Sequence, residues 1–217
     1  MNKDKLPILY TFRRCPYAMR ARMGILKGQT LCTIREVSLR DKPDEMVMVS
    51  PKGTVPVLLL STGQVIEESL EIMLWALAEN DKDDWLEPEY GTITEMFSLI
   101  NKIDYEFKFH LDRYKYSTRY KNEDSFFHRG KALDYLLALN QNLERHLNLF
   151  GEKTSLADIA IFPFVRQFAN ANRDWFDGLD IEPLQSWFLR YLQAEIFLDV
   201  MEKYPKWIPG DENILFP

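Results

Sequence analysis

Cys15 carries the strongest chemical signal in the sequence. It follows a short apolar run, residues 8–12, and precedes Pro16 directly, with Arg13 and Arg14 on its N-terminal side. Proline suits the first position of a helix because its φ is fixed and it needs no N–H partner there, so Cys15 falls at the N-cap. The exposed N–H groups of a helix start, the helix dipole and the arginines all favour a thiolate, which makes Cys15 a candidate nucleophile. The alternative is that Cys15 is a small apolar core residue.

The residue three positions after Cys15 indicates whether a second thiol lies nearby to resolve an oxidised Cys15. In the run Cys-Pro-Tyr-Ala the fourth position is Ala18, and not a second cysteine. An oxidised Cys15 therefore has no neighbouring thiol to resolve it and needs an external one, which favours glutathione-coupled chemistry over a dithiol oxidoreductase. Cys32 has no basic or helix-terminal neighbours, and we predict that it packs in the core.

The elements around Cys15 follow the order βαβ and then ββα. The spacing of apolar and turn residues predicts a strand at 8–12, a helix at 18–27 ended by Gly28, a strand at 31–39, a hairpin of 57–60 with 65–66, and a helix opened by 67–69. The first two strands should be parallel because a helix connects them. Pro56 cannot donate to a central ladder, so it belongs at the first position of its strand. This order is the thioredoxin-like pattern.

Glu68 and Ser69 allow two interpretations. An acid and a hydroxyl at a helix N-terminus stabilise the helix whatever the function of the protein. In the second interpretation, Ser69 and the first N–H groups of the helix hold a ligand carboxylate while Glu68 accepts from an ammonium group. Val55, kept extended by the following Pro56, can pair through its backbone with a peptide lying beside it.

Three motifs together resemble a known family. Cys-Pro-Tyr-Ala at 15–18, Thr-Val-Pro-Val at 54–57 and Glu-Ser-Leu-Glu-Ile at 68–72 are similar to the glutathione-binding domain of cysteine-type glutathione transferases. The resemblance is closest to the omega class, with a wider kinship to glutaredoxins, and the spacings between the motifs match that class without gaps.

The resemblance implies a role for each matching residue. Cys15 would form a mixed disulfide with glutathione, and Val55, beside a cis Pro56, would pair with the cysteinyl part of the tripeptide. Glu68 and Ser69 would hold the γ-glutamyl group. Lys42 would meet the glycyl carboxylate. The resemblance also implies a homodimer.

The remaining two thirds of the chain are predicted to be helical. The acidic segment 80–90 contains Pro88 and is interpreted as a linker between a domain at 1–79 and an all-helical domain at 91–217. Long helices are expected at 92–115 and 126–150, and a further one at 184–192, with coil from 204 to 217. Ser155 and Asp158 form a variant capping box that looks like the one in the helical domain of glutathione transferases.

Aromatic and basic residues alternate between 105 and 120. We expect Tyr105, Phe109 and Tyr114 to line a cleft between the domains, with Tyr17 and Trp175 as further candidates for a substrate pocket. Plain helix packing is the alternative. Nucleic-acid binding is a third interpretation, which the acidic chain opposes.

Composition narrows the class of protein. A net charge of −6 and a pI near 5.2 argue against a nucleic-acid partner. No apolar run approaches the length of a membrane span or of a signal peptide's apolar core, so we expect no membrane contact and a cytoplasmic location. No histidine has metal-ligand spacing with another ligand type, and no metal is expected.

The sequence therefore predicts an α/β thioredoxin-like N-terminal domain followed by an all-α C-terminal domain. The expected protein is an enzyme, a glutathione-dependent thiol transferase or reductase with glutathione as co-substrate and a small electrophile or disulfide as partner. Disulfide exchange, reduction of dehydroascorbate-type oxidants and deglutathionylation all fit such a site. The alternative is a non-catalytic module of the same fold that binds ligands or docks proteins.

Overall fold

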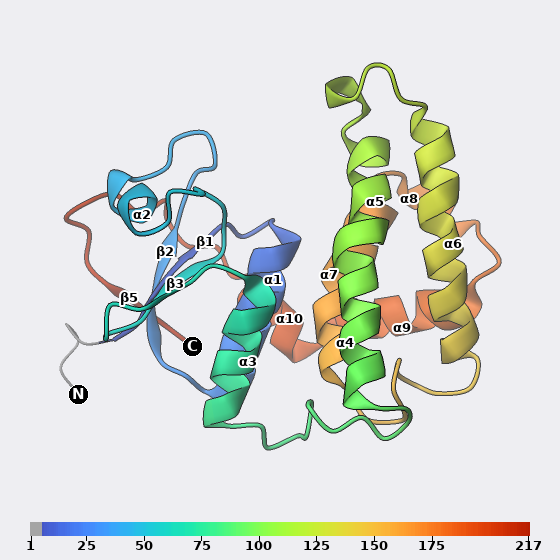
Figure 1. Ribbon diagram of the computed structural model, residues 1–217, viewed down its shortest axis with the longest axis horizontal. Helices are drawn as coiled ribbons and strands as arrows, with labels where there is room; N and C mark the ends of the chain where they lie inside the picture. The colour runs from blue at the N-terminus through green and yellow to red at the C-terminus, as the bar shows by residue number, and fades with distance from the viewer. Residues whose placement is uncertain (1–5) are drawn as a thin grey trace. The chain divides into compact units, whose positions relative to one another are not determined.

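The structure is a computed structural model that describes residues 6–217, and the chain divides into two compact units (Figure 1). Unit 1 comprises the chain up to Lys82 together with Ala194–Pro217, and unit 2 comprises Asp83–Gln193. The boundary after Lys82 falls inside the expected linker. The division differs from the expected one at the C-terminus, because the last segment belongs to unit 1.

Unit 1 contains, within the described residues, one five-stranded sheet with the strand order β4-β3-β1-β2-β5. Its strands are β1 (Ile8–Thr11), β2 (Cys32–Glu36), β3 (Val57–Leu59), β4 (Val65–Ile66) and β5 (Ile214–Phe216). β1 and β2 are parallel, whereas β1 with β3 and β3 with β4 are antiparallel. The predicted thioredoxin-like order is therefore confirmed, although β2 is shorter than expected and Pro56 precedes β3 instead of starting it.

The C-terminal strand β5 corrects the sequence prediction. Residues 204–217 were expected to be coil, but Ile214–Phe216 pairs antiparallel with β2, with Phe216 opposite Cys32. The backbone N–H of Trp207 also donates to the carbonyl of Glu36 at 2.8 Å. The end of the chain therefore covers the edge of the sheet that β2 would otherwise leave open.

The helices of unit 1 are α1 (Pro16–Gly28), α2 (Asp44–Val49), α3 (Ser69–Glu79) and α10 (Glu195–Val200). α1 and α3 lie side by side (Figure 1), and glycines of α1 allow the close approach. A Cβ at Gly24 would lie 2.9 Å from the Cα of Met73, and one at Gly28 would overlap the carbonyl oxygen of Ala76. Gly28 is thus needed for packing, and the left-handed residue that ends the helix is Gln29, with φ 52°.

Unit 2 is all helical. Its elements are α4 (Ile93–Lys102), the π-helical turn η2 (Ile103–Phe107), α5 (Lys108–Lys115), the 3₁₀ turn η3 (Ser117–Arg119), α6 (Ser125–Leu143), α7 (Leu156–Ala169), α8 (Arg173–Asp177) and α9 (Glu182–Gln193). The helix expected at 92–115 is present as the run from α4 to α5. The helix expected at 126–150 ends at Leu143, and Leu147 lies in the following loop with 55% of its surface exposed.

The capping box at the start of α7 is confirmed. Ser155 donates to the carboxylate of Asp158 through its N–H at 2.9 Å and through its hydroxyl at 2.7 Å. The same carboxylate accepts from the N–H of Leu149 at 2.9 Å and from Nε1 of Trp187 in α9 at 2.8 Å. Burial raises the pKa of Asp158, and these four hydrogen bonds oppose that rise. Asp158 therefore ties a loop and two helices of unit 2 together.

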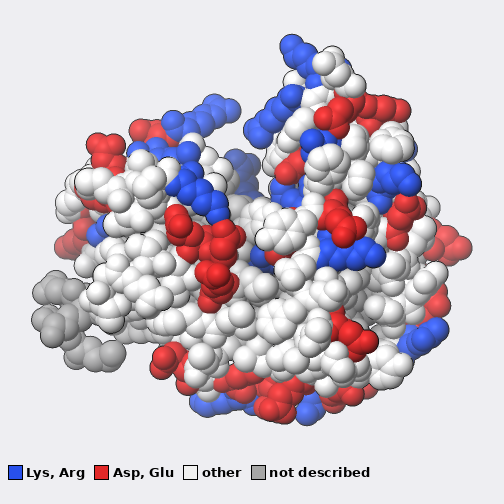
Figure 2. Space-filling model, viewed as in Figure 1, with Lys and Arg blue, Asp and Glu red and all other residues white. Residues whose placement is uncertain are grey.

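The surface carries both signs of charge. Figure 2 shows basic and acidic side chains interspersed over the face in view, with uncharged surface between them. Among the helices of residues 6–217, none has the length and apolar character needed to cross a membrane.

The close packing of α1 on α3 leads to a prediction about stability. Gly28→Ala is expected to lower the free energy of unfolding by about 2 kcal/mol, because the new methyl group overlaps the backbone of Ala76. The control is Gly130→Ala in α6, where a Cβ has no atom within 4 Å and alanine favours the helix by up to about 1 kcal/mol. Urea unfolding of both variants would contradict this packing if Gly28→Ala proved as harmless as Gly130→Ala.

Candidate active site

Cys15 is the N-cap of α1, and Pro16 is the first residue of that helix, as the sequence predicts. The N–H of Cys15 donates to the carbonyl of Phe12 at 3.0 Å, and its carbonyl accepts from Met19 at 2.9 Å. The side chain is half-buried, and its thiol donates to the carbonyl of Val55 at 3.6 Å. Cys15 therefore lies at the start of a helix as a partly exposed residue, which is the setting that favours a reactive cysteine.

Arg22 is the charged neighbour of Cys15 that the sequence analysis missed. It lies on α1 and is only 1% exposed. Burial lowers its pKa to about 10, while the negative charges of Glu36 and Cys15 oppose that shift, so the guanidinium stays protonated at neutral pH. The available signal was its spacing of seven residues from Cys15, which is about two helical turns.

Cys32 is a packing residue, as predicted. It is fully buried in β2, and burial alone raises its pKa to about 12. Its thiol therefore stays protonated at neutral pH. Neither cysteine forms a disulfide, so Cys32 serves as an unreactive internal reference for Cys15.

Glu68 and Ser69 lie at the start of α3, but neither side chain caps it. Ser69 is buried, and its hydroxyl accepts from Nε of Arg20 in α1 at 2.9 Å. The exposed carboxylate of Glu68 pairs with the ammonium group of Lys52. No side-chain cap hydrogen bond is therefore made at the start of α3, while the negative charge of Glu68 still lies at the helix N-terminus, where it is favourable. The ammonium group that meets Glu68 in this structure belongs to Lys52.

The other predicted ligand contacts lie in the loops that flank α2. The Val55–Pro56 peptide bond is cis, as the resemblance implies. Lys42 is exposed just before α2, with Nζ 3.4 Å from the position that a Cβ of Gly53 would take.

Tyr17, the substrate-pocket candidate of unit 1, lies in the first turn of α1. It is half-buried, and the guanidinium of Arg20 lies 5.2 Å from its ring centroid.

The aromatic candidates of unit 2 do not form a single group. Tyr105 is 76% exposed in the π-helical turn, and Phe109 is 46% exposed with the guanidinium of Arg113 stacked 3.4 Å from its ring centroid. Tyr114 and Trp175 both pack on Phe168, with ring centroids 5.5 and 6.0 Å away. The guanidinium of Arg129 lies 4.2 Å from the ring centroid of Trp175 and 6.0 Å from that of Tyr114.

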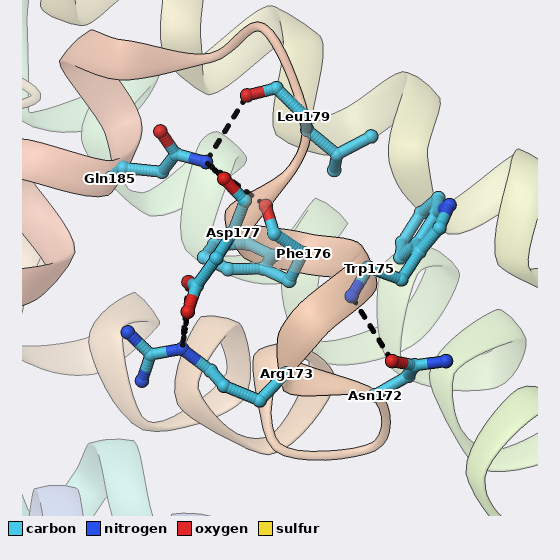
Figure 3. A network of polar contacts seen from close by, with 7 residues as sticks. All are labelled: Asn172, Arg173, Trp175, Phe176, Asp177, Leu179 and Gln185. Carbon is cyan, nitrogen blue, oxygen red and sulfur yellow. Dashed lines mark hydrogen bonds and ion pairs between the residues drawn. The ribbon is translucent and has the colours of Figure 1, made fainter.

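Trp175 is positioned by the short helix α8 (Figure 3). The backbone N–H of Trp175 donates to Oδ1 of Asn172 at 3.1 Å, and Asn172 thereby caps the helix. Nε2 of Gln185 in α9 donates to the carbonyls of Phe176 and Leu179 at 2.9 and 3.2 Å. These contacts fix the end of α8 to α9 and so hold the Trp175 ring in unit 2.

Two histidines join α5 to α6 near Phe109. Nδ1 of His110 and Nδ1 of His128 are 2.8 Å apart, so one proton lies between them. Nε2 of His128 lies 2.8 Å from the carboxylate of Glu123, which also accepts from Arg113 at 2.6 Å. Burial, followed by the charges of His128 and Arg113, lowers the pKa of His110.

This pair should make the stability of the protein depend on pH. A histidine with a lowered folded-state pKa binds fewer protons in the folded chain than in the unfolded chain below its ordinary pKa of ~6.5. The free energy of unfolding should therefore fall as pH decreases from about 7.5 to about 5.5. His110→Gln is expected to reduce that dependence in urea unfolding. Equal slopes for the wild type and His110→Gln would contradict the role of the pair.

Across residues 6–217 no group of three or more His, Cys, Asp and Glu side chains is placed to hold a metal ion.

The fold and the sequence both lead to one class of protein. Residues 9–85 match the family described as the N-terminal domain of glutathione S-transferases. Residues 9–85 therefore form a domain of this family, and the helical unit follows that domain along the chain.

Individual relatives are similar over parts of the chain. "Glutathione S-transferase DHAR2" of Arabidopsis thaliana is 28% identical over 152 residues, which cover 69% of this chain and 64% of the relative. A "Probable glutathione transferase" of Aplysia californica is 42% identical over 55 residues, which cover 25% of this chain and 60% of the relative. The chain thus spans less than two thirds of the length of these relatives.

Solved structures show the same fold at low identity. A glutathione transferase family member from Pseudomonas fluorescens, with two glutathione molecules bound, has a TM-score of 0.78 at 16% identity, covering 93% of this chain and 95% of the other. A glutathione transferase from Phanerochaete chrysosporium, in complex with oxidized glutathione, has a TM-score of 0.78 at 16% identity. The similarity covers 92% of this chain and 96% of the other. Glutathione transferase Omega 3C from Trametes versicolor has a TM-score of 0.74 at 19% identity, covering 89% of this chain and 83% of the other.

Proposed function

We propose that the protein is a glutathione-dependent thiol transferase of the cysteine type, with Cys15 as the nucleophile. The observation that carries this proposal is the position of Cys15, half-buried at the N-cap of α1 with its thiol beside the carbonyl of Val55. The helix N-terminus beside the thiol favours a thiolate. Cys32, in contrast, is buried and protonated.

The chemistry needs two thiol–disulfide exchanges. The Cys15 thiolate attacks the glutathione sulfur of a mixed disulfide, the old S–S bond breaks, and the departing thiolate takes up a proton. The thiolate of a second glutathione then attacks the Cys15 mixed disulfide, which releases glutathione disulfide and restores the Cys15 thiolate. Over both steps, one mixed disulfide and one free glutathione give one free thiol and one glutathione disulfide, and the proton lost by the second glutathione balances the one that the departing thiolate takes up.

The same unit supplies groups that suit the tripeptide. The Val55 backbone would pair with its cysteinyl part, and Lys42 would meet the glycyl carboxylate as a point charge. Ser69 and the first N–H groups of α3 would hold the γ-glutamyl carboxylate, with Glu68 accepting from the ammonium group. Two solved structures of this fold are described with glutathione or oxidized glutathione bound, which supports glutathione as the ligand.

The second substrate is a small disulfide, a dehydroascorbate-type oxidant or a glutathione conjugate. Tyr17, two residues after Cys15 in the first turn of α1, is the proposed contact for it within unit 1. Tyr105 and Phe109 are exposed and less suited to enclose a small molecule. A homodimer and a cytoplasmic location are part of the same proposal.

The test is to incubate the protein with glutathione disulfide and to map any adduct by intact-mass and peptide analysis. One glutathionyl group is expected on Cys15 and none on Cys32, which is the internal control. An adduct elsewhere, or none at all, would reject the mechanism and leave a non-catalytic ligand-binding or docking module as the explanation.

A further inference from the structure

Arg22 is a buried charge to which the proposed glutathione contacts give no role. Its Nη2 donates to the carbonyl of Arg13 at 2.9 Å, and its Nε donates to the carbonyl of Val200 at 3.0 Å. Nη1 donates to the hydroxyl of Thr11. One guanidinium group therefore joins the end of β1, the turn that leads to Cys15 and the C-terminal helix α10.

The charge of Arg22 acts on Cys15 because the interaction is mutual. The negative charge of Cys15 favours the protonated form of Arg22, so the protonated guanidinium favours the thiolate of Cys15 to the same extent. Buried charges interact more strongly than exposed ones because the surrounding dielectric constant is lower and salt screens them less. Arg14 is exposed, so salt screens its charge more strongly than that of a buried group.

Glu36 is the counter-charge in this part of unit 1. Its Oε1 accepts from the N–H of Arg13 at 2.8 Å, and the charges of Arg22 and Arg13 oppose the rise that burial causes in its pKa. Glu36 thus bonds to the same residue of the turn as Arg22, through the N–H of Arg13 where Arg22 uses its carbonyl.

We propose that Arg22 is a positioning residue for Cys15, which fixes the turn that presents the thiol and supplies a buried positive charge that favours the thiolate. The inference rests on the proposed function, since it concerns the reactivity of the same cysteine. It goes further by making the C-terminal segment part of the support of the reactive group, because Val200 accepts the third hydrogen bond of Arg22.

The experiment compares the pH dependence of Cys15 alkylation by iodoacetamide in the full-length wild type and in variants. Arg22→Met is expected to raise the midpoint by about one unit, which lowers the rate by up to about tenfold at pH values below the wild-type midpoint. Arg22→Lys keeps the charge but cannot reproduce the three bonds, so a smaller rise is expected. Arg35→Met is the control, because Arg35 also bonds and stacks within unit 1, on Tyr10 and Trp207. Its loss should leave the midpoint unchanged.

A second measurement needs no variant and decides the question if Arg22→Met fails to fold. The wild-type midpoint is measured at low and at high salt. If a buried charge stabilises the thiolate, the midpoint should change little with salt. If an exposed charge such as that of Arg14 stabilises it, the midpoint should rise with salt towards the free-thiol value of ~8.5.

The outcomes separate this inference from the proposed function. A folded Arg22→Met variant with the wild-type midpoint, or a wild-type midpoint that rises with salt, would overturn the role of Arg22. The glutathione adduct on Cys15 would still form in either case. Absence of that adduct would instead overturn the proposed function, and the role of Arg22 with it.

Discussion

Cys15→Ser is expected to lower kcat/KM for the reduction of a glutathione mixed disulfide by about three orders of magnitude or more. A serine hydroxyl is not ionised at neutral pH and cannot form a disulfide, so the covalent step is lost completely. Glutathione binding, measured by calorimetry, should change only slightly, because the proposed contacts of the tripeptide lie on Val55, Glu68 and Ser69.

The control for this variant is Cys32→Ala. Cys32 is fully buried, so the variant should lose some stability but keep its activity once folded. Thiol transfer that survives Cys15→Ser, or that disappears in folded Cys32→Ala, would show that the nucleophile has been assigned to the wrong residue.

Asp158→Ala is expected to lower the free energy of unfolding by about 3–5 kcal/mol. The change leaves the N–H groups of Leu149 and Ser155, the Ser155 hydroxyl and Nε1 of Trp187 without their acceptor in the interior of unit 2. Asp158→Asn keeps one acceptor oxygen, so it should fall between the wild type and Asp158→Ala. Urea unfolding followed by tryptophan fluorescence measures the loss.

Asp134→Ala provides the matched control for Asp158. Asp134 is exposed on α6 and its carboxylate is 3.7 Å from the ammonium group of Lys131, so its loss should change the free energy of unfolding by less than about 0.5 kcal/mol. A loss below about 1 kcal/mol for Asp158→Ala would show that the buried carboxylate does not hold the helices of unit 2 together.

The local features of unit 1 were predictable from sequence because each has a short-range physical cause. Pro16 fixes the start of α1 and places Cys15 at its N-cap, and the apolar periodicity of residues 18–27 defines the helix that follows. The capping box of Ser155 and Asp158 is equally local. Each of these depends on residues within about one or two turns of one another.

Long-range pairings were not predictable. The strand Ile214–Phe216 has three residues and a proline directly after it, too short a run to show a period of two. The hydrogen bond from Arg22 to Val200 joins residues 178 positions apart, and no local sequence pattern predicts it. Gly28 was assigned to the helix end, although its close approach to Ala76 depends on how α1 meets α3.

The sequence predicted which residues lie at the candidate site better than it predicted their contacts. The sequence placed Glu68 and Ser69 at a helix start, but it did not indicate that Lys52 and Arg20 would contact them. Surface lysines and helix arginines are too common for sequence spacing to select these two. The aromatic residues between 105 and 120 were grouped by sequence distance, whereas helix geometry turns Tyr105 and Phe109 to the surface and Tyr114 towards Phe168.

The most direct test is the rate of Cys15 alkylation in the native, full-length protein as a function of pH. A thiolate stabilised at the start of α1 predicts a midpoint below the free-thiol value of ~8.5, with Cys32 unmodified in the same sample. A midpoint at or above that value would contradict the account, because Cys15 would then be mostly protonated at neutral pH.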